Sequence, residues 1–71
     1  MYLVIQKGYV TFGKGDTAEQ AWQDAKEWID SDDEKQEWDV AQLPSLQQAA
    51  DGELCIVSID DMDADEIELY A

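Results

Sequence analysis

The chain has 71 residues and a formal net charge of −14 at neutral pH, with 18 Asp and Glu, four Lys, and no His or Arg. Without His, Cys-His and Ser-His-Asp nucleophile systems and His-containing zinc sites are excluded, and without Arg there are no bidentate phosphate clamps. Phosphates repel a chain of this charge, so we expect no direct binding to nucleic acid.

The size of the chain fits one folded domain, residues 1–71. Hydrophobic residues make up 45% of it and include three Trp, too many for the disorder that accompanies low hydrophobicity and high charge. No apolar run approaches the roughly 20 residues that span a bilayer. Residues 1–5 also lack the basic flank and the length of a signal peptide. We therefore expect a soluble, cytoplasmic protein that does not bind membranes.

The first elements predicted are two strands. Tyr2 to Gln6 alternates and is rich in β-formers, and Tyr9 to Phe12 is a second run of this kind. Lys7-Gly8 between them suits a tight hairpin, after which Gly13-Lys14-Gly15 closes the second run. The alternative is one long strand with a bulge at Gly8.

A helix is predicted from Thr17 to Asp30. Either Asp16 with Glu19 or Thr17 with Gln20 can form a capping box at its start. Apolar residues then recur at spacings of three and four, which indicates a stripe packed on the sheet: Ala18, Ala21, Trp22, Ala25, Trp28 and Ile29. The small alanines allow close approach, and the stripe places Trp22 and Trp28 in the core.

The second half is less regular. The stretch with Trp38, Val40 and Leu43 is a candidate short strand that ends at Pro44. Ser45 to Gln48 is another capping-box pattern and Gly52 a helix stop, which predicts a short helix over Leu46 to Asp51. Two strands are predicted to follow, Glu53 to Ile59 and then an edge strand, Glu66 to Tyr70, whose alternation suits a hairpin with it.

The predicted fold is therefore a small α+β domain in the order β-β-α-(short α)-β-β, with one main helix on an antiparallel sheet. The single cysteine, Cys55, cannot form an internal disulfide, and its place in the apolar run Leu54 to Ile59 predicts a buried, inert thiol.

The charge is unevenly distributed. Residues 27–71 hold fifteen Asp and Glu against one Lys, whereas residues 1–26 hold three of each sign. The predicted helix also ends among acids, which opposes its macrodipole and costs stability unless function rewards it. Such a concentration of charge attracts cationic surfaces.

Two groups of residues are therefore predicted to bind a basic partner. The first is Glu27, Asp30, Asp32, Asp33, Glu34, Glu37, Trp38 and Asp39. The second is Asp60, Asp61, Asp63, Asp65, Glu66 and Glu68. Trp38 lies between Glu37 and Asp39, so it is either an exposed anchor ringed by acid or a cap on the core.

Metal binding and catalysis are not predicted. The alternating acids from Asp61 to Asp65 resemble the start of an EF-hand loop, but Glu66 stands where the loop needs Gly, and position twelve falls beyond the sequence. Only weak, nonspecific divalent-ion binding is expected there. With so many acids, no single carboxylate pair indicates hydrolysis, so we expect no enzyme activity and no cofactor.

Gly15-Asp16-Thr17-Ala18-Glu19-Gln20-Ala21, continued by Asp24-Ala25-Lys26-Glu27, resembles the strand-to-helix segment of HicB-like antitoxins. This resemblance implies a helix packed on a sheet and a role in masking a basic ribonuclease toxin. The chain is too short for the three strands that normally precede this helix in those proteins, and no DNA-binding tail follows.

By size, charge and lack of catalytic residues the chain also resembles small acidic inhibitors of phages and mobile elements, among them anti-CRISPR and anti-restriction proteins, many of which mimic DNA. Duplex DNA carries one negative charge per roughly 1.7 Å, a density that clustered carboxylates can approximate. The leading hypothesis is a DNA mimic, monomeric or homodimeric, that blocks a basic nucleic-acid-binding surface. The alternatives are the antitoxin and an acidic domain with no dedicated partner.

Overall fold

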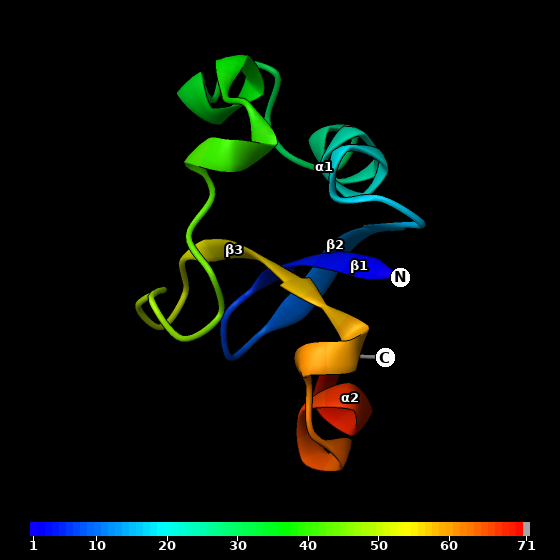
Figure 1. The fold of residues 1–71 in the computed structure, drawn as a ribbon. Helices are drawn as coiled ribbons and strands as arrows, with labels where there is room; N and C mark the ends of the chain where they lie inside the picture. The colour runs from blue at the N-terminus through cyan, green and yellow to red at the C-terminus, as the bar shows by residue number, and fades with distance from the viewer. Residues whose placement is uncertain (71) are drawn as a thin grey trace.

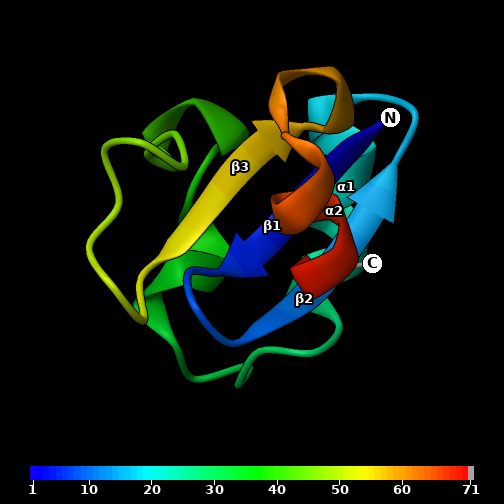
Figure 2. The same cartoon turned by 90° about the horizontal axis from the view of Figure 1, so that it is seen from below.

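A computed structural model describes residues 1–70 and contains an antiparallel sheet in the order β2-β1-β3 with one α-helix on each face (Figures 1 and 2). The strands are β1 (Tyr2–Gln6), β2 (Val10–Gly15) and β3 (Leu54–Ser58), and the helices are α1 (Ala18–Lys26) and α2 (Ala64–Tyr70). Three single 3₁₀ turns join them: η1 (Glu34–Glu37), η2 (Val40–Gln42) and η3 (Ile59–Asp61). The α+β class is as predicted, with three strands in place of four.

The predicted hairpin joins β1 and β2, so the single-strand alternative is wrong. Its turn is closed by a 2.9 Å bond from Tyr9 N to Gln6 O, and Gly8 takes the positive φ of 84° that only glycine adopts readily. β2 runs on to Gly15, beyond the predicted end. Ile5 pairs with Thr11 and Val4 with Gly13, so Phe12 is the extra residue of a β-bulge.

Helix α1 begins where Thr17 predicts it. The Thr17 hydroxyl accepts a 3.1 Å bond from Gln20 N, and the Gln20 side chain accepts one of 3.1 Å from Asp16 N. The helix ends at Lys26 and does not reach Asp30. Its last turn tightens into i to i−3 bonds from Glu27 N to Asp24 O and from Trp28 N to Ala25 O.

Helix α1 lies unusually close to β2 because two glycines face it. A Cβ on Gly13 would stand 2.4 Å from Ala25 N and 2.5 Å from Ala21 O, and one on Gly15 would stand 2.6 Å from the Cβ of Gln20. Ala21 and Ala25 supply the small side chains on the helix side and are fully buried. This core also contains Val4, Trp22, Leu43 and Leu54, with Phe12, Ile29, Trp38 and Ile56 packed against it.

The opposite face of the sheet is covered by α2, so the predicted edge strand over Glu66 to Tyr70 is wrong. Asp63 Oδ1 accepts a 2.9 Å bond from Glu66 N, and Glu66 Oε1 accepts one of 3.3 Å from Asp63 N, a capping box that starts a helix. Ile67 and Tyr70, three residues apart, then pack on the core with Leu3, Ile5, Cys55 and Val57. The alternation of polar and apolar residues over Glu66 to Leu69 suggested a strand, but the residues that contact the core, Ile67 and Tyr70, have the spacing of one helix face.

Tyr70, the last residue of α2, forms hydrogen bonds that link this helix to the β1–β2 hairpin. The Tyr70 hydroxyl accepts a 2.7 Å bond from Gly8 N, and the Tyr70 carbonyl accepts a bond from the Thr11 hydroxyl. The helix therefore bonds to both the turn of the hairpin and strand β2.

The predicted helix over Leu46 to Asp51 is also wrong. Ser45 O accepts bonds from Gln48 N and Ala49 N, which makes one turn, and the chain then leaves the helical path. The hairpin holds it there, since Lys7 N donates to Glu53 O, Gly52 N donates to Lys7 O, and the Gln6 amide donates to Gly52 O at 3.1 Å. The candidate strand near Trp38 is likewise absent, and η2 stands there instead.

This segment crosses the outer edge of β3. Leu43 belongs to the core under α1 and Leu46 to the core under α2. Between them, Pro44 O accepts a 3.0 Å bond from Ile56 N, and Ser45 bridges to Ile56. One edge of the sheet is therefore covered. No helix within residues 1–70 is long and apolar enough to cross a membrane.

Gly13→Ala is expected to destabilise the protein by about 1–3 kcal/mol, since the new methyl group would clash with the backbone of α1. Lys14→Ala, at the exposed neighbouring position, is the matched control and should stay within about 0.5 kcal/mol of the parent. Urea unfolding followed by circular dichroism measures both. Equal stability of Gly13→Ala and the parent would contradict the close packing of α1.

Candidate functional site

The carboxylates are almost entirely uncompensated. Against 18 acids in the chain, residues 1–70 form one ion pair, 3.9 Å from Lys35 Nζ to Asp33 Oδ1. Lys7 Nζ donates to Ala49 O at 2.8 Å, and the ammonium groups of Lys26 and Lys35 stand 5.3 Å from the ring centres of Trp22 and Trp38. The surface therefore presents a large excess of negative charge to any partner.

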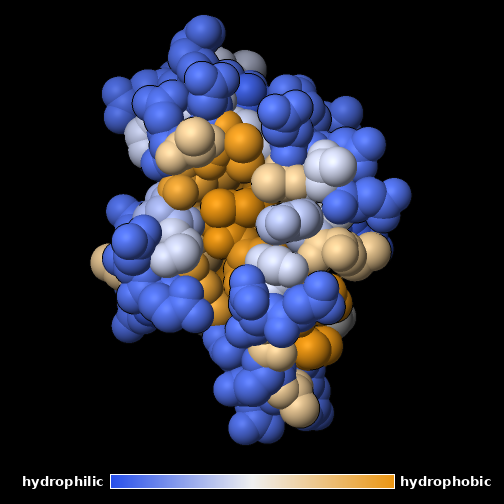
Figure 3. All heavy atoms as spheres, in the orientation of Figure 1, coloured by the Kyte–Doolittle hydropathy of each residue, from blue (hydrophilic) through white to orange (hydrophobic). Residues whose placement is uncertain are grey.

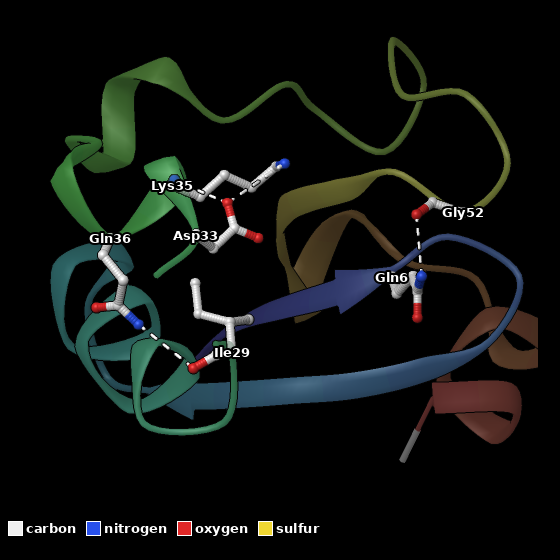
Figure 4. Close-up of polar contacts among 6 residues, drawn as sticks. All are labelled: Gln6, Ile29, Asp33, Lys35, Gln36 and Gly52. Atoms are coloured by element: carbon white, nitrogen blue, oxygen red, sulfur yellow. Dashed lines mark hydrogen bonds and ion pairs between the residues drawn. The ribbon is translucent and has the colours of Figure 1, made fainter. Parts of the chain in front are cut away.

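The first predicted group lies on one connected segment between α1 and η2, which we call the first acidic segment (residues 27–39). Short hydrogen bonds order it: Asp30 Oδ1 accepts from Asp32 N at 2.9 Å, and Asp33 Oδ1 from Lys35 N at 2.9 Å. The Gln36 amide donates to Lys26 O at 2.8 Å and to Ile29 O at 3.4 Å, and Figure 4 shows the second of these bonds. A side chain of η1 thus caps the end of α1 and fixes the segment against it.

Part of this segment lines a hollow of ≈ 480 Å³ between the segment, the bulge of β2 and the start of β3. Four predicted residues line it, Asp30, Asp33, Glu34 and Trp38, together with Phe12, Trp28, Lys35 and Glu53. Figure 4 shows the Asp33–Lys35 ion pair, whose two residues line the hollow. Carboxylates and aromatic rings therefore border the same space, a combination that suits cationic side chains.

The remaining residues of the first group stand outside the hollow. Glu27, Asp32 and Glu37 are exposed. Asp39 lies on the other side of Trp38, where it lines a separate hollow of ≈ 810 Å³ with Trp22 and Lys26.

Trp22 is buried as predicted and Trp38 takes one of its two predicted positions, whereas Trp28 does not lie where the sequence predicted. Trp38 is half-buried against the core under α1, and its carbonyl accepts a 2.8 Å bond from Trp22 Nε1, so it caps the core. Trp28 was predicted to be buried and is 71% exposed, because α1 ends at Lys26 and the stripe does not continue to it. The exposed aromatic residue beside the acids is Trp28. Its helical spacing in the sequence had predicted a buried position instead.

The second predicted group lies on η3 and α2, on the opposite face of the sheet from the first acidic segment (Figures 1 and 2). Glu66 and Glu68 therefore lie on a helix and not on the predicted edge strand. The molecule presents two separate acidic surfaces. Figure 3 shows hydrophilic side chains around the rim of one face and at the end that carries α2.

The stretch that resembles the start of an EF-hand loop, Asp61 to Asp65, has a structural role. The oxygens of Asp63 and Glu66 cap the first turn of α2. Across residues 1–70, no group of three or more acidic, Cys or His side chains is placed to hold a metal ion.

Cys55 is fully buried in β3. Burial raises the pKa of its thiol to about 11, more than the charges of Lys7 and Glu53 change it. At neutral pH it is a protonated core side chain, as the sequence predicted.

No family model, curated protein or solved structure matches this chain. Its own geometry is therefore the basis for assigning a function.

The exposure of Trp28 can be tested by fluorescence. Trp28→Phe should remove the emission that acrylamide quenches most readily and change stability by less than about 0.5 kcal/mol. Trp22→Phe should leave quenching intact and cost about 1–3 kcal/mol, since it leaves the buried Trp38 carbonyl without its donor. Quenching that falls only when Trp22 is replaced would contradict this arrangement.

Burial of Cys55 predicts low reactivity. At pH 8 a chromogenic disulfide reagent should modify the native thiol at least about 100-fold more slowly than the thiol in denaturant, because the thiolate fraction and access are both small. Since the folded pKa is raised, this group lowers stability as pH rises from 9.0 towards about 11 and has no effect below that window. Rapid modification at pH 8 would contradict the buried position.

Proposed function

We propose that this protein is an acidic inhibitor that occupies the basic nucleic-acid-binding surface of a phage-defence complex, of the anti-CRISPR or anti-restriction type, and blocks its binding to DNA. Its density of charge carries the proposal. A duplex as long as the molecule's largest dimension, 34 Å, bears about 20 phosphate charges at one per roughly 1.7 Å. The chain bears 18 carboxylates and a net charge of −14 over that length. A surface built to hold phosphates would gain similar counterion-release energy from it.

The first acidic segment is the proposed contact surface. Two of its carboxylates, those of Asp30 and Asp33, accept bonds from the backbone, which lowers the cost of ordering them on binding. Trp28 adds an exposed aromatic ring that can lie over Arg or Lys side chains. The second acidic surface lacks such an anchor within the part of the chain described, so it serves as the internal comparison.

The antitoxin alternative has the same electrostatics and a different partner, a small basic ribonuclease. The other alternative, an acidic domain with no dedicated partner, predicts no selective capture at all. An experiment that identifies what is bound, and where, separates the three.

Charge reversal on the two surfaces provides the test. Asp32, Glu34 and Glu37 are exposed and accept no hydrogen bond within residues 1–70, so replacing all three by Lys changes charge with little effect on the fold. Asp60, Asp65 and Glu68 satisfy the same criteria on the other surface and form the matched control triple. Both triples change the net charge equally.

The immobilised protein should retain nucleic-acid-binding proteins from host lysate at 50 mM NaCl and release them to duplex DNA or to 500 mM NaCl. The first triple should lower capture at least about tenfold, and the control triple by less than about threefold. Equal losses would show that net charge alone acts. Capture that neither DNA nor salt reverses would overturn the proposal, and a captured ribonuclease in place of DNA-binding proteins would favour the antitoxin.

A further inference from the structure

One edge of the sheet is covered and the other is open. The crossing segment at Pro44 and Ser45 covers β3, whereas nothing lies along the outer edge of β2 in residues 1–70 (Figure 2). Apart from its ladder with β1, the backbone of β2 makes one hydrogen bond within those residues, from Lys14 N to Asp24 Oδ2 at 3.1 Å. An open edge of this kind is a template for another strand.

Apolar side chains flank this edge. A hollow of ≈ 620 Å³ runs along β2, with Trp28 on the α1 side and Met1, Ile59 and Tyr70 on the α2 side. Five large apolar residues are exposed in the described part of the chain, and three of them line this hollow: Met1 at 52%, Val10 at 50% and Trp28 at 71%. We call this hollow and its strand the β2 groove.

Strand β2 and its hairpin bring no acid to the β2 groove. Residues 1–15 contain two lysines and no acid, and residues 16–71 contain all 18 acids and the other two lysines. The one carboxylate in the groove, Asp24, already accepts the Lys14 N–H.

We propose that the β2 groove binds a second copy of this chain, with the two β2 strands paired antiparallel around a twofold axis to form a continuous six-stranded sheet. Charge favours this contact, since two chains of net charge −14 repel each other least where acids are few, and the one acid in the groove, Asp24, is already hydrogen-bonded. A twofold axis perpendicular to the sheet keeps each acidic surface outward. The same contact buries Val10 of both copies.

Sedimentation equilibrium of the full chain over a range of concentrations tests the proposal. We expect a monomer–dimer equilibrium that shifts towards dimer at least about fivefold between 50 and 500 mM NaCl, as salt screens repulsion between the acidic surfaces. This response is opposite to that expected for capture of a basic partner. A chain that is monomeric at every salt and protein concentration overturns the dimer and leaves the inhibitor proposal intact.

Two substitutions at Val10 distinguish an effect of the groove on dimerisation from an effect of net charge. Val10→Lys and Val10→Asp change the net charge in opposite directions, yet both place a charge in the interface, so both should weaken the dimer at least about tenfold. Leu69→Lys and Leu69→Asp are the controls, since Leu69 is 60% exposed on α2 outside the groove, and they should change dimerisation less than threefold. A dimer weakened equally by the Leu69 variants would place the contact elsewhere and overturn the proposal.

Hydrogen exchange of the unsubstituted protein gives a measurement that does not depend on how the variants fold. The outward-facing amides of Val10 to Gly13 should become more protected as protein concentration rises, while those of Gln47 and Gln48 should not change. Protection in β2 that is independent of concentration would contradict strand pairing between copies.

Discussion

Burial of both faces of one strand is the constraint on which the rest of this structure depends. In β1, Val4 and Ile5 point to opposite faces of the sheet and neither has any exposed surface. Three short strands cannot bury two faces alone, so each face needs a helix, and in 71 residues each helix has to be short. Helix α1 achieves enough contact through the close approach at Gly13, and α2 through Tyr70, which bonds to the hairpin. Self-repulsion among the acids opposes this compact state, so the free energy of unfolding that these few contacts provide is small.

Local patterns in the sequence were sufficient where an element's own residues determine it. The β1–β2 hairpin, the start of α1 at Thr17 and strand β3 follow from turn chemistry, a capping box and an apolar run. The errors occurred where contacts distant in sequence decide. The turn after Ser45 has a capping box but no helix. The Lys7 side chain bonds to Ala49 O, 42 residues away, and the Lys7 backbone bonds to Gly52 and Glu53, which holds the next residues in a turn.

The site was predictable in composition and only partly in arrangement. That acids would be exposed follows from their solvation, whereas their division between two faces depends on α2 being a helix. The Asp63–Glu66 capping box was the available signal, but these residues were compared only with an EF-hand loop, which they do not complete, and not with a helix cap. Trp28 was assigned to the core by the apolar stripe, whose last members lie beyond the end of α1 at Lys26.

The acids fall into two groups, those that accept hydrogen bonds from the backbone and those that do not. The expectation that acids oppose the macrodipole of α1 loses force, because the helix ends with Lys26 and the Gln36 amide caps its last carbonyls. Asp33 and Asp63 instead accept backbone N–H bonds at the starts of η1 and α2, where a negative charge is favourable. These carboxylates have a structural reason to be present.

Exposed acids without such bonds, among them Asp32, Glu34 and Glu37, have no structural reason of this kind. They add repulsion to a small domain, and their side chains form no hydrogen bond or ion pair within residues 1–70, so the proposed binding of a basic partner would account for their number. The proposed dimer would account in the same way for the hairpin, which has two lysines and no acid. A chain that is acidic on both faces of its sheet has no acid in its edge strand β2, and at that edge electrostatic repulsion opposes apolar burial less.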